Sequence, residues 1–219
     1  MSVEKAGIAM WKGHYALLVV ASMCAGGLET QPAYAAGFQP VVIRSQQVEE
    51  GPYHVDGLRT QIVFSVSCLG MSWYRGFLSG VSGQLWLDPQ HPEKSHVSLK
   101  APVSSITTTT GDVSRMLMEK DWFEARTYPV AEFISTEVTS NGPSVATISG
   151  KLTLHGVTHP VTLRAHFVGA GENPINHFYD VGFEAQGIIQ RSAFGLTNAL
   201  PAVGDDVTLT VSGVFEKEH

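Results

Sequence analysis

The sequence predicts an all-β protein, an eight-stranded antiparallel barrel with one short helical segment. Apolar and polar residues alternate with a period of two in run after run, which is the pattern of a strand that buries one face. Turn residues such as Asn141-Gly142-Pro143 and Gly169-Ala170-Gly171 separate these runs. About eight closely spaced runs favour a meander that closes into a barrel, with a two-sheet sandwich as the alternative.

Each strand is predicted from its own alternating run. Ile62, Phe64 and Val66 alternate with polar neighbours, and only Val63 interrupts the pattern. The predicted strands cover residues 59–68, 74–88, 94–103, 130–140, 145–154, 160–168, 179–189 and 206–216. Together they define a barrel domain over residues 51–217.

Residues 112–123 break the alternation. This segment is rich in helix-forming residues, and Asp112 stands where it could cap the first turn. We expect a helical connection over one opening of the barrel, with Met116, Trp122 and Phe123 facing the interior.

The N-terminal segment has the parts of a secretory signal peptide. Lys5 and Lys12 precede an apolar run over residues 15–25, which is shorter than the roughly 20 residues of a membrane-spanning helix. Ala33-Tyr34-Ala35 has the small residues of a cleavage site. We therefore assign residues 1–35 to a signal peptide and expect a periplasmic or secreted protein, with no stable membrane insertion after its removal.

Two alternatives exist for this segment, namely an uncleaved membrane anchor and a lipoprotein signal that uses Cys24. The lipoprotein interpretation is the weaker one, because Met23 is too large for the position before a lipidated cysteine. Residues 36–50 show no clear period, and we assign them to a linker or N-terminal arm.

The composition excludes several classes of protein. Only 16% of the 219 residues are charged and the formal net charge is −6, so we expect no nucleic acid partner. Two cysteines are too few for a disulfide scaffold. Because cleavage would remove Cys24, Cys68 would be the remaining thiol, and we expect it to be buried and inert.

The inward-facing positions of the predicted barrel are almost all aliphatic or aromatic. The interior of a small barrel is either filled by side chains or holds one ligand, and the alternation is consistent with both. A hollow apolar interior would suit a hydrophobic ligand. The candidate lipid-binding residues are Phe64, Val66, Leu85, Leu99, Phe133, Leu152, Leu154, Leu163, Phe167 and Phe183.

Four stretches, in order along the chain, carry recognisable motifs. They are Ser104 to Thr108, Asp121-Trp122-Phe123 with Tyr128 to Thr136, Gly150 to Leu163, and Arg191 to Leu196 with Val203 to Val207. These stretches resemble motifs of the YceI-like family of bacterial, mostly exported, polyisoprenoid-binding proteins. The resemblance extends from about Tyr53 to Phe215 and implies a lipocalin-like barrel with a long tunnel for an isoprenoid chain, so it favours a hollow interior over a filled one.

The sequence departs from this family at its first long strand. Arg59-Thr60 stands where the family usually has a histidine followed by serine or threonine, and Cys68 replaces a second histidine. Arg59 is therefore one candidate contact for a ligand head group. Arg191 is another, because an arginine in an apolar motif needs a carboxylate, backbone or ligand partner, and a structural ion pair is the alternative. Tyr74 lines the rim of the barrel or packs under a turn.

These observations predict a protein that carries or sequesters a long isoprenoid or similar amphiphile, without catalysis, cofactor or metal. His155 and His159 lie four residues apart, but across a turn and not on one helix face. No recognisable nucleophile and base spacing occurs. The alternatives are an enzyme acting on a lipid-like substrate and a filled barrel that serves as an interaction or stress-response module.

Overall fold

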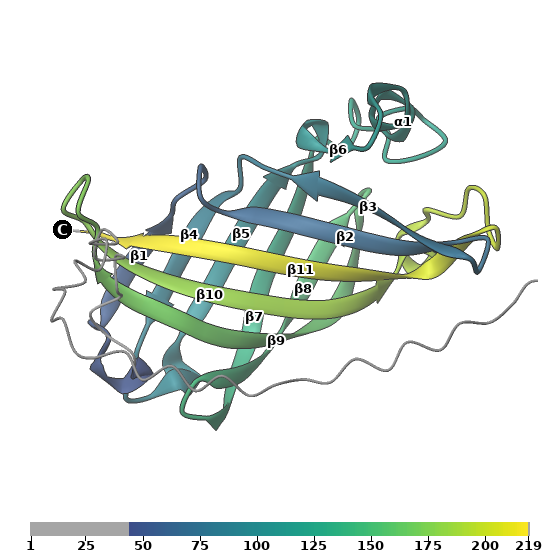
Figure 1. Cartoon of the computed structure of the whole chain (residues 1–219). Helices are drawn as coiled ribbons and strands as arrows, with labels where there is room; N and C mark the ends of the chain where they lie inside the picture. The colour runs from purple at the N-terminus through teal and green to yellow at the C-terminus, as the bar shows by residue number, and fades with distance from the viewer. Residues whose placement is uncertain (1–43, 219) are drawn as a thin grey trace, which may run out of the picture. The chain divides into compact units, whose positions relative to one another are not determined.

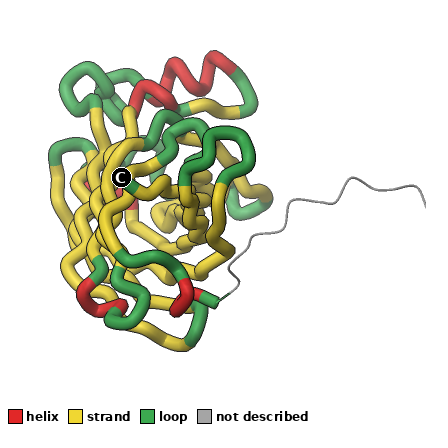
Figure 2. The backbone as a smooth tube through the Cα atoms, turned by 90° about the vertical axis from the view of Figure 1, so that its left-hand side faces the viewer, coloured by secondary structure: helices red, strands yellow, loops and turns green. Residues whose placement is uncertain are grey.

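The computed structural model describes residues 44–218, and in this range eleven antiparallel strands form one sheet. Eight of them close into a barrel, which confirms the predicted fold class (Figure 1). Figure 2 shows the same strands turned by 90°. The strands of the ring are, in spatial order, β1 (Gly51–Val55), β4 (Ser82–Leu87), β5 (His96–Pro102), β7 (Val130–Gly142), β8 (Val145–Leu154), β9 (Val157–Glu172), β10 (Tyr179–Gln190) and β11 (Val203–Lys217), which pairs back with β1.

Three further strands extend the sheet beyond β11. They are β2 (Gln61–Cys68), β3 (Ser72–Leu78) and the short β6 (Thr107–Thr108). The long strand β11 pairs with β2 between Val203 and Ser212, and with β1 only at its C-terminal end. The ring therefore closes through β1 at one end, while the β2–β3 hairpin forms the wall at the other.

The membership of the ring differs from the sequence prediction. The predicted strand 74–88 is wrong as a single element, because Gly80 adopts a left-handed backbone (φ 64°) and separates β3 from β4. β1 was not predicted, since it has only five residues and contains Pro52. Its alternation is nevertheless clear in the structure: Tyr53 and Val55 are buried, and the Tyr53 hydroxyl donates to the Glu49 carbonyl at 2.6 Å.

The helical connection is present but shorter than predicted. Helix α1 spans Gly111–Leu117, and turns replace the rest of the predicted segment 112–123. Thr110, not Asp112, caps it, because the Thr110 hydroxyl accepts a hydrogen bond from the Val113 amide. As predicted, Trp122 and Phe123 line the barrel interior, whereas Met116 borders the same cavity but is 42% exposed.

The N-terminal assignments are described only in part. The predicted signal peptide, residues 1–35, and the first residues of the predicted linker lie outside the described residues. A short 3-10 turn, η1 (Ser45–Gln47), precedes Val48, which is buried against the barrel core. Over residues 44–218, no helix has the length and apolar character needed to cross a membrane.

Candidate functional site

Two partly open cavities lie along the barrel interior of the described residues. The larger has a volume of about 310 Å³ and the smaller about 160 Å³. They share no lining residue, but they follow one another along the same strands. On β8, Ile148 lines the smaller cavity and Leu152 the larger, and on β10 Ala185 and Ile189 do the same. The larger cavity alone is at the lower end of the ~300–1,000 Å³ typical of ligand pockets.

Every candidate lipid-binding residue lies on the wall of one of these cavities. The period-two alternation therefore selects the inward faces, although contact of these residues with a ligand stays a prediction. Leu85, Leu99, Phe133, Leu163, Phe167 and Phe183 line the smaller cavity, and Phe64, Val66, Leu152 and Leu154 line the larger.

Two inward-facing glycines mark the boundary between the cavities. Gly150 lies between Ile148 and Leu152 on β8, and the ring of Phe133 occupies the space where a side chain of residue 150 would be. Gly187 lies at the same level on β10, and Leu163 fills its space in the same way. Large side chains from the neighbouring strands thus occupy the space that a side chain at either glycine would need.

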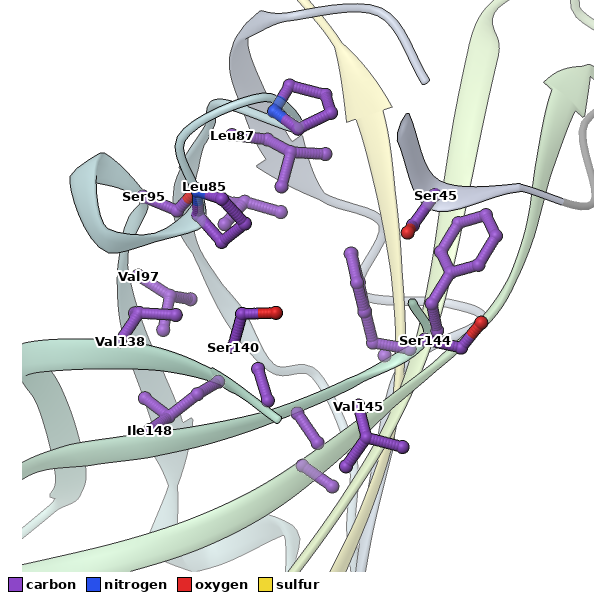
Figure 3. A pocket seen from close by; sticks show the side chains of 18 of the residues that line it. Ser45, Leu85, Leu87, Ser95, Val97, Val138, Ser140, Ser144, Val145 and Ile148 are labelled. Carbon is purple, nitrogen blue, oxygen red and sulfur yellow. The ribbon is translucent and has the colours of Figure 1, made fainter. Parts of the chain in front are cut away.

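The smaller cavity is mostly apolar, and its polar lining includes several serines (Figure 3) and the side chains of Gln46, Asp88 and His96. Leu85, Val97 and Ile148 contribute apolar surface on the side of Ser140, and Ser144 is on the other side of the view, where Ser45 also lies. The segment before β1 also lines the smaller cavity, through Ser45 and Val48. Nothing in the aperiodic sequence of that segment indicated this role.

The larger cavity is lined by the β2–β3 hairpin, the α1 segment and the ends of β8, β10 and β11. Nearly all of its surface is aliphatic or aromatic. Its polar side chains include Cys68, Tyr74 and Arg191. Cys68 is a free thiol and is only partly buried. The prediction of a buried cysteine is therefore wrong, because part of the side chain is exposed. Several cavity residues, such as Ile189 and Leu209, follow the predicted alternation but were not singled out as site residues.

Arg191 is fixed by backbone carbonyl groups. Its Nε donates to the Gly204 oxygen at 2.8 Å, Nη1 to the Leu196 and Asn198 oxygens at 2.5 and 2.9 Å, and Nη2 to the Val203 oxygen at 2.8 Å. Four of the five guanidinium N–H groups are thereby used. Burial lowers the pKa of Arg191, and the nearby Asp205 carboxylate opposes that shift. Arg191 therefore holds the loop between η4 (Arg191–Phe194) and β11 against the end of the barrel.

Arg59 lies at neither cavity. It forms ion pairs with Asp56, with Asp180 at 2.5 Å and with Glu216 at 3.1 Å, and its side chain is 39% exposed. The hydrogen bond to Asp180 is the main reason that its pKa is raised. The structure thus gives Arg59 a role in tying together strand ends, and does not support the predicted contact with a head group.

The two histidines of the β8–β9 hairpin also have structural partners. His155 Nδ1 lies 3.1 Å from the Phe194 oxygen, and its ring packs edge-on against Tyr128. The ring of His159 packs against Phe194. Within residues 44–218, no three His, Cys, Asp or Glu side chains are grouped so that they could hold a metal ion.

Together, the closed antiparallel sheet and its hollow, apolar interior define a β-barrel of the class that can enclose one small hydrophobic molecule. The chain belongs to the YceI-like family: the YceI-like domain matches residues 53–215. This confirms the family that the four sequence motifs resemble.

Relatives of known sequence and structure agree with this assignment. The chain is 34% identical over 169 residues to a UPF0312 protein of Photorhabdus laumondii, covering 75% of this chain and 87% of that protein. It is 33% identical over 168 residues to a UPF0312 protein of Pseudomonas aeruginosa, covering 76% and 87%.

Two solved structures share the fold. BcnA of Burkholderia cenocepacia superposes with a TM-score of 0.66 at 24% identity, covering 73% of this chain and 98% of that one. A polyisoprenoid-binding domain from Saccharophagus degradans, implicated in plant cell wall breakdown, superposes with a TM-score of 0.57 at 16% identity, covering 78% and 100%.

Proposed function

We propose that this protein binds a long isoprenoid or a similar amphiphilic lipid in the barrel interior, and carries or sequesters it. The observation that carries the proposal is the larger cavity, which is hollow and walled almost entirely by apolar side chains. The smaller cavity continues in the same direction along β8, β10 and β11, so an extended tail could span both. The polyisoprenoid-binding domain among the structural neighbours supports the same class of ligand.

The energetics of burial favour a long tail. Each buried CH₂ group contributes about 0.8 kcal/mol, so a five-carbon prenyl unit contributes roughly 4 kcal/mol before the cost of ordering the chain. A few units would therefore give tight binding without any polar contact. Selectivity among such lipids would come from the length of the interior and from its few polar groups.

Binding without turnover is the favoured mode. The larger cavity has a thiol, a phenol and a guanidinium on its wall, but no His, Asp or Glu among its described lining residues. Asp88 and His96 lie on the wall of the smaller cavity, where Asp88 accepts hydrogen bonds from the Gln90 and His91 amides and His96 Nδ1 lies 3.3 Å from the Lys94 oxygen. General acid–base catalysis needs a group that can accept and return a proton at a suitable pKa. A filled barrel that acts only as an interaction module is less favoured, because both cavities are open space.

Organic extraction of the purified protein, followed by lipid mass spectrometry, tests the proposal. We expect a copurified amphiphile with a long apolar tail, or uptake of an added polyprenyl quinone by the empty protein. Finding neither would falsify the proposal. Incubation with the same lipid and analysis of products separates a carrier, which returns the lipid unchanged, from an enzyme.

The proposal places the mature protein in the periplasm or outside the cell, because residues 1–35 have the sequence pattern of a signal peptide. Cell fractionation and N-terminal sequencing of the mature chain test this. Cleavage after Ala35 is the expected result, whereas an intact N-terminus in the membrane fraction would favour the anchor alternative.

A further inference from the structure

The polar side chains Cys68, Tyr74 and Arg191 lie at the same end of the larger cavity. In the sheet register, Tyr74 is opposite Val66 and Cys68 is opposite both Ser72 and Val203. Arg191 donates to the carbonyl oxygen of Val203. Tyr74 and Cys68 are therefore diagonal neighbours on the inward face of the β2–β3 hairpin, and Arg191 is fixed next to them.

The Tyr74 hydroxyl is buried and has no hydrogen-bond partner. Burying a hydroxyl without a partner is unfavourable, and most buried tyrosine hydroxyls find one. A tyrosine hydroxyl can both donate and accept a hydrogen bond. An oxygen atom of a ligand in the larger cavity would satisfy this group.

Little of the adjacent positive charge is available to a ligand. Four of the five N–H groups of Arg191 already donate to backbone carbonyl oxygens, which leaves at most one for a head group. Phosphate and diphosphate groups are normally held by several charge-assisted hydrogen bonds or by a bidentate arginine. Among the described lining residues, the larger cavity has no other Arg or Lys.

We propose that the head group of the bound lipid is uncharged, and that its carbonyl or hydroxyl oxygen accepts a hydrogen bond from Tyr74 at the Cys68 end of the larger cavity. The tail then runs from this end, past Phe64 and Leu152, towards the smaller cavity. This inference rests on the proposed lipid binding, and names the charge and the position of the head group.

The first test compares lipids that have one tail length and different heads, namely a polyprenol, a polyprenyl quinone, a polyprenyl phosphate and the plain hydrocarbon. Because a net hydrogen bond is worth about 0.5–1.5 kcal/mol, Tyr74→Phe should weaken binding of the prenol and the quinone by about threefold to tenfold. It should leave binding of the hydrocarbon unchanged. The control is Tyr128→Phe. Because Tyr128 lines neither cavity, this substitution should alter none of the affinities.

The outcomes separate this inference from the proposed function. Unchanged binding of the prenol and the quinone by Tyr74→Phe, or a preference of the wild-type protein for the phosphate, would overturn the head-group assignment while lipid binding stands. Failure of the wild-type protein to bind any of the four compounds would overturn the proposed function itself.

A second test locates the head group by the reactivity of Cys68. A short-chain quinone should occupy the head-group end and slow alkylation of the Cys68 peptide, measured by mass spectrometry. Tyr74→Phe should lessen this protection at the same quinone concentration. If the short-chain quinone binds but Cys68 is alkylated as fast as in the protein without quinone, the head group lies elsewhere. That result would overturn the inference.

Discussion

The ring of Phe133 on β7 lies over Gly150 on β8, so closely that a Cβ atom at residue 150 would be 2.6 Å from Phe133 Cε2. Phe133 lines the smaller cavity, and its partner in the sheet register, Leu152, lines the larger. The pair therefore sets the width of the barrel where the two cavities meet.

Adding a methyl group at this point should displace the ring. We expect Gly150→Ala to destabilise the fold by about 1–3 kcal/mol, because the new Cβ also meets the Ile134 carbonyl oxygen and the wall has little room to adjust. Urea unfolding measures the change. Gly182→Ala is the matched control, since its Cβ would meet atoms only at ordinary contact distance, 3.7 Å. Equal losses in both variants would show that the contact between Phe133 and Gly150 is unimportant.

Removing the ring should widen the passage between the two cavities. Phe133→Ala is expected to cost about 3–5 kcal/mol of stability and to shift the copurified lipids towards longer tails. Mass spectrometry of extracted lipids gives the distribution of tail lengths. Phe77→Ala, on the exposed side of β3, should leave the distribution unchanged. An unaltered distribution in a folded Phe133→Ala protein would mean that this ring does not limit tail length.

A charge in the larger cavity should prevent lipid loading. Leu154→Arg would place an unpaired guanidinium against the tail, and we expect the folded variant to contain no lipid. Phe133→Arg should act in the same way in the smaller cavity. Circular dichroism establishes folding before the lipid is measured. Leu58→Arg is the control, because Leu58 is almost fully exposed and its variant should load normally. Normal loading of a folded Leu154→Arg protein would exclude this residue from the site.

Arg191 should contribute to stability through the geometry of its guanidinium group as well as through its charge. Lysine keeps the charge but cannot reach four carbonyl oxygens from one planar group, so Arg191→Lys leaves buried acceptors without a donor. We expect a loss of more than about 2 kcal/mol, together with faster hydrogen exchange in the loop after η4. Arg164→Lys, at an exposed position on β9, should change neither measurement. Equal losses of stability and equal hydrogen exchange in the two variants would contradict this role of Arg191.

The carboxylate of Asp205 should make stability depend on pH. The Ser192 hydroxyl and then the Ser192 amide donate to it, and these bonds lower the pKa of Asp205. A carboxyl whose pKa is lower in the folded state stabilises the fold above its unfolded value, about 3.9, and this contribution is lost as the pH falls through the folded value. Wild-type protein should exceed Asp205→Asn in unfolding free energy at pH 7, and the gap should narrow below about pH 4.

Urea unfolding at pH 7 and at pH 3 measures the two differences, with the exposed neighbour Asp206→Asn as the control. A gap between wild type and Asp205→Asn that is the same at both pH values would contradict this role.

Period-two alternation predicted the inward faces well, because it reports directly which side of a strand is buried. Phe64, Phe133 and Phe183 were found in this way from their spacing alone. Strand pairing was harder to predict. Whether β2 joins the ring depends on β1, a strand of five residues, and on a single turn at Gly80.

The polar residues were less accessible to sequence reasoning, because their partners lie far away in the chain. Arg59 pairs with Asp180 and Glu216, which its local sequence does not indicate. Asp205 accepts two hydrogen bonds from Ser192, which lies in a different segment of the chain. Such contacts become visible only once the loops around the barrel are placed.

The way in which one side of the larger cavity is closed has a consequence for how a lipid could be exchanged. The edge strand β6 pairs only with β3, and the segment from Val103 to Ala125 seals that side through apolar side chains such as Ile106 and Leu117. Moving α1 away would expose apolar surface but would break no backbone hydrogen bond between the strands of the sheet. The activation energy for exchange on this side would then reflect hydration of those side chains, while the hydrogen-bonded frame of the ring stays intact.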